Sequence, residues 1–170
     1  METLPIANKK LFLQYAIPCG QVLVKRGTLD SKLLESLRKD VVSDKDIDLD
    51  ISSLFPVASK MCTIIAKNMG RDIIDDDIIR RYFLIEHEKA IRWRAQIFPD
   101  ISLKECFVYV GKVIKADEKT IVKTQNGERV LDNNLWTELK KGDFITTHYD
   151  YVAERIPPEL ARKVLEKGMI

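Results

Sequence analysis

The chain has few cysteines, and they lie far apart. Its 170 residues contain only Cys19, Cys62 and Cys106. No Cys-x-x-Cys pair is present, so the sequence predicts neither a zinc knuckle nor a disulfide framework. An odd number of widely spaced thiols is typical of a reducing compartment, and we therefore expect a cytoplasmic protein.

Targeting signals and membrane spans are also missing. The first residues, 1–5, lack the basic segment followed by an apolar segment that marks a secretory signal. No apolar run is long enough to cross a bilayer, and no internal repeat is found. The formal net charge is only +2, so the chain lacks the strong positive field expected of a protein that binds nucleic acid or an anionic membrane.

The common catalytic motifs are absent or incomplete. No Ser-His-Asp arrangement, phosphate-binding glycine loop or dinucleotide fingerprint occurs, and we expect no enzyme. His87 is followed by a glutamate, as in a zincin helix, but Ile91 stands where that motif needs its second histidine. We therefore interpret His87 as a structural residue that is exposed or partly buried.

The chain before Cys106 has the periodicity of helices. Glycines and prolines end several of these segments, as Gly27, Gly70 and Pro99 do. The predicted helices cover residues 6–16, 19–24, 32–40, 52–68 and about 76–97. The sequence therefore predicts an all-helical domain, residues 1–103.

From Glu105 onward the apolar period changes to two, and β-branched and aromatic residues become frequent. Asn126 and Gly127 form the strongest hairpin signal in the chain, because both residue types tolerate positive φ. We also expect a turn of helix at 133–139. The predicted strands cover 107–114, 119–124, 128–131, 144–148 and 151–156.

A final helix is predicted at 159–167, because two prolines precede it and proline suits the first turn of a helix. Close spacing of short strands indicates a small antiparallel OB-like β-barrel. The predicted fold class is therefore α+β. The helical domain is followed by a second domain, residues 104–170, made of this barrel and its C-terminal helix.

Two segments of the second domain carry a specific order of residues. Cys106 is followed by Phe-Val-Tyr-Val and then by Gly-Lys-Val at 111–113, and Lys-Lys-Gly-Asp at 140–143 leads into a strand that ends at His148. This set resembles the hydrogenase-maturation chaperones of the HypC/HupF family. Those proteins have a cysteine, a few apolar residues, Gly-Lys-Val, a hairpin, a Lys-x-Gly-Asp turn and a strand with a histidine. The resemblance covers the second domain only.

The resemblance implies a role in assembling a metal centre. In that family the cysteine and the histidine help to hold iron that carries cyanide and carbon monoxide. The iron passes between a scaffold partner and the hydrogenase large subunit. Carried over to this chain, Cys106 would be the thiolate ligand and His148 an imidazole ligand or a supporting donor. Both donor types suit iron, and Lys104 or Lys112 nearby would favour the thiolate form.

The resemblance also suggests a surface for protein partners. We expect this surface to include Phe107, Tyr109, Gly111 and Lys112. Neither a membrane nor nucleic acid is the expected partner.

Two departures from the family pattern leave alternatives open. The family's cysteine stands at the extreme N-terminus, whereas Cys106 is internal, and Val110 replaces a proline. Cys106 therefore keeps a second interpretation as a cysteine at the domain junction, packed against the long helix. His148 also has a second interpretation, as a strand residue with a single hydrogen bond.

Two other function classes compete with the accessory protein. One is a single-stranded nucleic-acid-binding OB-like module with a helical interaction domain. Its near-neutral charge argues against it. The other is an enzyme with Cys106 as nucleophile and His148 as base, which lacks a third orienting group. The residues that would contact nucleic acid are Phe107, Tyr109, Trp136, Tyr149 and Tyr151 for stacking, and Arg92 and Arg94 for phosphate.

Overall fold

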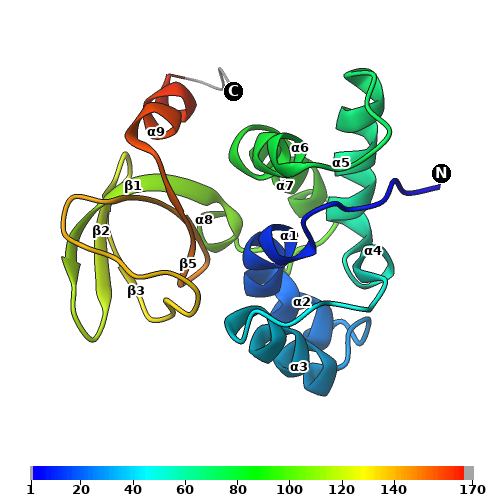
Figure 1. The fold of residues 1–170 in the computed structure, drawn as a ribbon, viewed down its shortest axis with the longest axis horizontal. Coiled ribbons are helices and arrows are strands. Elements are labelled where there is room, and N and C mark those ends of the chain that lie inside the picture. The colour runs from blue at the N-terminus through cyan, green and yellow to red at the C-terminus, as the bar shows by residue number, and fades with distance from the viewer. Residues whose placement is uncertain (1, 167–170) are drawn as a thin grey trace. The chain divides into compact units, whose positions relative to one another are not determined.

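The computed structural model describes residues 2–166, so the last residue of the predicted final helix, Lys167, lies outside the described residues. The chain divides into two compact units, Met1–Tyr82 and Phe83–Ile170. Helices come first in the chain and an antiparallel sheet follows, so the predicted α+β class is confirmed (Figure 1). Within residues 2–166, no helix is both long and apolar enough to cross a membrane.

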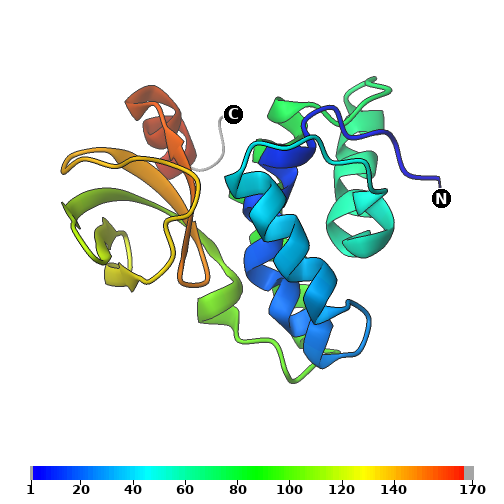
Figure 2. The same ribbon diagram turned by 60° about the horizontal axis from the view of Figure 1, so that its bottom comes forward.

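The first unit consists of short helices, several of which begin at an aspartate or asparagine. The side chains of Asn8, Asp30, Asp50 and Asp75 each accept a hydrogen bond from a backbone N–H of the first turn, which satisfies a donor that the helix leaves unpaired. Helix α3 packs against α1 and α2 (Figure 2). The helices are α1 (Lys9–Ala16), α2 (Gly20–Lys25), α3 (Ser31–Val42), α4 (Ile51–Leu54), α5 (Pro56–Asn68) and α6 (Asp76–Arg81).

The predicted long helix at 76–97 is interrupted. After α6 comes a π-helical segment, Tyr82–Glu86, and then α7 (His87–Ala95). The division between the two compact units falls inside this π-helical segment. The predicted domain boundary between residues 103 and 104 instead falls within α8 (Leu103–Cys106), so the second unit contains α7 and α8 as well as the strands.

The second unit contains one open five-stranded sheet with the order β3-β2-β1-β4-β5. Every strand pair is antiparallel, and the predicted β2–β3 hairpin is confirmed. Its two turn residues are Gln125 and Asn126, one position earlier than predicted, because Gly127 already pairs with Thr124 as the first residue of β3. Of Asn126 and Gly127, only Gly127 has a positive φ, +103°. The elements are β1 (Val108–Ala116), β2 (Thr120–Thr124), β3 (Gly127–Leu131), β4 (Phe144–His148), β5 (Tyr151–Ile156) and α9 (Pro158–Leu165).

Two apolar clusters hold this unit together. Three valines, an isoleucine and a leucine, one from each of the five strands, form the first. The second joins the sheet to α9 through Val110, Ile156 and Ala161. The buried residues of the first are Val113, Val122, Leu131, Ile145 and Val152.

The closed barrel that the sequence predicts is not confirmed, because the sheet is open. Among the described residues, β3 and β5 are not paired along their length. The segment after β3 meets β5 through an isolated parallel bridge between Asn133 and Tyr151. There the Asn133 N–H donates to the Asp150 carbonyl at 3.1 Å, and the Val152 N–H donates to the Asn133 carbonyl at 2.8 Å.

The predicted turn of helix at 133–139 is wrong. The segment has no helical hydrogen bonds and lies along β5 instead. The Trp136 indole N–H donates to the carbonyls of Val152 and Ala153, both at 2.9 Å, and its ring stacks on Tyr151. These tertiary contacts favour an extended segment over the helical pattern of the local sequence.

Candidate metal centre

Three buried side chains of the second unit bring metal-ligating atoms together. One ligand atom each from His87, Cys106 and His148 lie within 4.8 Å of one another. The exposed fractions of the three residues are 3%, 5% and 0%. The structure therefore brings together the two residues that the sequence predicts as ligands and adds a third. His87 is fully buried, so the expectation that it is exposed or only partly buried is wrong.

Cys106 and His148 meet because β1 and β4 are antiparallel neighbours. Val108 near the start of β1 pairs with His148 at the end of β4. The Tyr149 N–H also donates to the carbonyl of Glu105 at 3.0 Å, which ties the residue after His148 to the residue before Cys106. The end of β4 is thus held beside α8, whose last residue is Cys106.

His87 reaches the same place as the first residue of α7. It follows directly on the π-helical segment Tyr82–Glu86, a type of helix irregularity that is frequent at functional sites. Its ring lies edge-on to the His148 ring, with centroids 5.1 Å apart and an interplanar angle of 87°. The Phe83 ring packs on both imidazoles, with its centroid 5.6 Å from that of His87 and 6.2 Å from that of His148.

Burial determines the protonation state of His87. Removal from water lowers the pKa of His87 well below its usual value of 6.5, and the neighbouring His148 lowers it further. The imidazole is therefore neutral at physiological pH and keeps a lone pair for a metal ion.

The remaining cysteines lie elsewhere. Cys62 is fully buried in α5, and burial raises the pKa of its thiol well above the ordinary range. It is the inert core thiol that its position in an apolar run predicts. Cys19 is half-buried in the first unit, where its Sγ donates to the Ala16 carbonyl at 3.1 Å.

The donor set fits a transition-metal ion. The three ligand atoms are at most 4.8 Å apart, so an ion at their centre would be at most about 2.8 Å from each, against bond lengths of about 2.0–2.3 Å to histidine nitrogen and cysteine sulfur. Inward movement of about 0.5 Å for the cysteine sulfur and about 0.7–0.8 Å for each histidine nitrogen closes that difference. Two imidazoles and a thiolate suit iron, zinc, cobalt or copper, whereas calcium and magnesium prefer oxygen ligands.

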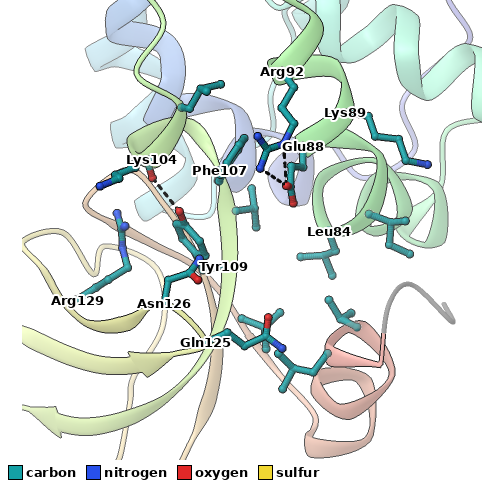
Figure 3. A pocket seen from close by; sticks show the side chains of 16 residues that line it. Leu84, Glu88, Lys89, Arg92, Lys104, Phe107, Tyr109, Gln125, Asn126 and Arg129 are labelled. Atoms are coloured by element: carbon teal, nitrogen blue, oxygen red, sulfur yellow. Dashed lines mark hydrogen bonds and ion pairs between the residues drawn. The ribbon is translucent and has the colours of Figure 1, made fainter. Parts of the chain in front are cut away.

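A cavity of about 900 Å³ lies in the same unit (Figure 3). Its walls come from the π-helical segment, α7, α8, β1, the β2–β3 turn, β3 and α9. It is lined by four cationic side chains and one carboxylate, Glu88. The cations are Lys89, Arg92, Lys104 and Arg129.

Phe107 and Tyr109, two of the predicted partner-binding residues, line this cavity and are covered by arginines. Arg92 lies over the Phe107 ring at 4.9 Å and also donates to Glu88 at 2.8 Å. Arg129 lies over the Tyr109 ring at 4.8 Å. The cavity wall is therefore built from stacked guanidinium and aromatic groups, as Figure 3 shows.

The other two predicted partner-binding residues lie elsewhere on β1. Gly111 is buried, and a Cβ there would be 2.5 Å from Val122 Cγ2 and 2.7 Å from the Lys123 carbonyl oxygen, so its place is set by close approach of two strands. Lys112 is exposed and lies 5.7 Å from the centre of the Phe144 ring.

The aromatic residues of the nucleic-acid alternative do not form an exposed stacking row. Tyr151 is only 4% exposed and is stacked with Trp136, while Phe107 and Tyr109 have arginines over their faces. Arg94 lies over Phe98 in the same way. These intramolecular contacts occupy groups that bases and phosphates would need.

A scan against protein-family models and a search of curated proteins found no match for this chain. The resemblance to the HypC/HupF family therefore rests on the quoted residues.

Proposed function

We propose that this chain is a HypC-like accessory protein that holds iron during assembly of a hydrogenase metal centre. One observation carries the proposal. Cys106 and His148, which the resemblance selects, are separated by a hairpin and a long loop, yet both are buried and their ligand atoms lie within 4.8 Å of each other. A chance correspondence of sequence letters would not require the two side chains to meet.

The chemistry of these buried side chains supports iron as cargo. A thiolate is a soft, strongly donating ligand that suits low-spin iron, and a neutral imidazole suits iron generally. Both side chains are buried, which excludes bulk water from the cargo. None of the three cysteines forms a disulfide, which supports the expected cytoplasmic location.

The architecture supports the same proposal at a coarser level. The strand order and the parallel bridge between Asn133 and Tyr151 are compatible with an OB-like barrel whose closure is incomplete. We propose that the cavity lined by Phe107 and Tyr109 receives the protein partner. Four cations against one carboxylate favour an acidic partner segment.

Infrared spectroscopy on protein purified without oxygen from its native host tests the proposal. The expected result is a set of cyanide and carbonyl bands, lost in Cys106→Ala and weakened in His148→Ala. Cys62→Ala is the matched control, because that thiol is buried within α5 of the first unit and does not belong to the cluster, and it should keep the bands.

Affinity purification from the same host gives the second readout. Maturation proteins or a hydrogenase large subunit should accompany the wild-type chain. Absence of the bands, together with absence of such partners from both the wild type and Cys106→Ala, would contradict the proposed function.

A further inference from the structure

We infer that His87 is a third metal ligand, so that His87, Cys106 and His148 together hold one transition-metal ion as a three-donor site. The inference rests on the proposed function for the location of the site and adds a ligand from α7, outside the part of the chain that carries the family resemblance. It makes the site a tripod of two nitrogens and one sulfur.

The composition of the chain makes the cluster informative. The sequence contains only two histidines, and both lie here beside one of only three cysteines. The three residues come from three separate elements, α7, α8 and β4, so no local repeat or shared helix face brings them together. Packing alone would be served by any apolar side chain at these buried positions.

The physical state of the residues fits ligation. His87 and His148 are 3% and 0% exposed, so bulk water does not compete with a metal ion for their ring nitrogens. Phe83 packs against both histidine rings and limits their movement, which prepares the donors before the ion arrives. A bound ion would be a shared partner for two imidazoles and a thiolate that are all buried from water.

The number of donors matters for the cargo. Two protein ligands leave a metal ion weakly held, whereas three fix its position and still leave coordination sites open for further ligands. The open positions are where diatomic groups or a partner's side chain would bind.

Cobalt(II) titration of the reduced, chelator-treated full chain tests the inference. Cobalt(II) reports thiolate ligation through a charge-transfer band in the near ultraviolet and reports coordination geometry through its visible bands. We expect one equivalent to bind with both signals. Cys106→Ser should lose the charge-transfer band, and His87→Phe should keep the band but weaken affinity about a hundredfold or more.

Two variants at position 87 separate ligation from packing. His87→Phe preserves an aromatic side chain beside Phe83 but removes the donor, whereas His87→Cys restores a donor but not the ring. Under the inference His87→Cys regains most of the affinity and strengthens the charge-transfer band, while His87→Phe does not. Circular dichroism confirms that each variant is folded before titration.

The outcomes distinguish this inference from the proposed function. Cobalt affinity and visible bands that are unchanged in a folded His87→Phe would overturn the third ligand, even if the infrared bands from the native host depend on Cys106 and His148. A three-donor cobalt site without diatomic bands or maturation partners would support the ligand set and overturn the hydrogenase assignment. No cobalt binding by the wild type would overturn the third ligand directly.

Discussion

Cys62 and Cys106 are both buried thiols, but within residues 2–166 only Cys106 belongs to a cluster of metal-ligating side chains. Around Cys62, burial raises the thiol pKa and disfavours the thiolate. Around Cys106, two imidazoles lie within coordination range, so a metal ion could replace the proton of the thiol. The environment of each residue, and not its burial, separates an inert thiol from a candidate ligand.

The low pKa of His87 predicts a loss of stability in acid. In the unfolded chain this imidazole takes up a proton near pH 6.5, but in the native state burial opposes protonation to a much lower pH. The unfolded state therefore binds more protons below about pH 6.5, and the free energy of unfolding falls as the pH falls. Acidification from about pH 7.5 to about pH 5 should therefore lower the free energy of unfolding through this group.

Urea denaturation of the metal-free protein at several pH values measures this effect. His87→Phe is the matched variant and should show a shallower loss of stability over the same range. An equally steep pH dependence in His87→Phe would show that His87 does not contribute.

The two buried thiols should also differ in alkylation. We expect iodoacetamide to modify the half-buried Cys19 first. It should leave Cys62 unmodified in the native protein, because the Cys62 thiol is buried and protonated. Cobalt(II) should slow modification of Cys106 at least about tenfold, since a coordinated thiolate is not available as a nucleophile. Peptide mass spectrometry measures each rate, and Cys19 serves as the control that the metal should not affect. Equal protection of Cys19 and Cys106 would contradict coordination at Cys106.

At the scale of elements, sequence periodicity predicts the strands well but cannot locate His87. The alternation after Glu105 is strong enough to predict all five strands, and antiparallel pairing then places Cys106 near His148. The zincin motif takes both histidines from one helix, whereas the partners of His87 come from α8 and β4. The signal that could have found it is compositional, because the chain contains only two histidines.

The contact between β1 and β2 predicts a severe effect of a small substitution at Gly111. An added methyl group would come within 2.7 Å of the Lys123 carbonyl oxygen, a backbone atom that cannot move without shifting β2. Gly111→Ala should therefore lower the free energy of unfolding by about 2 kcal/mol or more.

Lys115→Ala is the matched control for this substitution. Lys115 lies on the same strand, is exposed and makes only a surface ion pair, so its removal should change stability by about 0.5 kcal/mol or less. Urea denaturation compares the two variants. If Gly111→Ala unfolded at the same urea concentration as the wild type, the close approach of β1 and β2 would be contradicted. The prediction that Gly111 belongs to a partner-binding surface would then stand again.

At the scale of the whole molecule, amino-acid composition and hydrophobic periodicity are sufficient to predict the α+β class. They are not sufficient to predict where the chain divides into two units. Pro99 is a natural place for a boundary because it ends a helical pattern. The structure instead groups α7 and α8 with the sheet. Contacts such as Arg92 over Phe107 and His87 against His148 create this grouping, and a local pattern contains no information about them.

Three fragments test which division matters for the site. Fragment 83–170 contains all three donors and should unfold in one cooperative transition and bind cobalt(II) as the full chain does. Fragment 98–170 keeps α8 and the sheet but lacks α7. It should retain strand structure through the valine and isoleucine cluster, bind cobalt(II) about a hundredfold more weakly, and expose Cys106 to faster alkylation. Fragment 104–170 begins at the predicted boundary, so it lacks α7 and also the first residue of α8. Comparison of 104–170 with 98–170 therefore isolates the effect of disrupting α8. If 98–170 matches 83–170 in cobalt affinity and in Cys106 protection, then α7 contributes neither a ligand nor a cover, and the site reduces to the two residues that the sequence predicts.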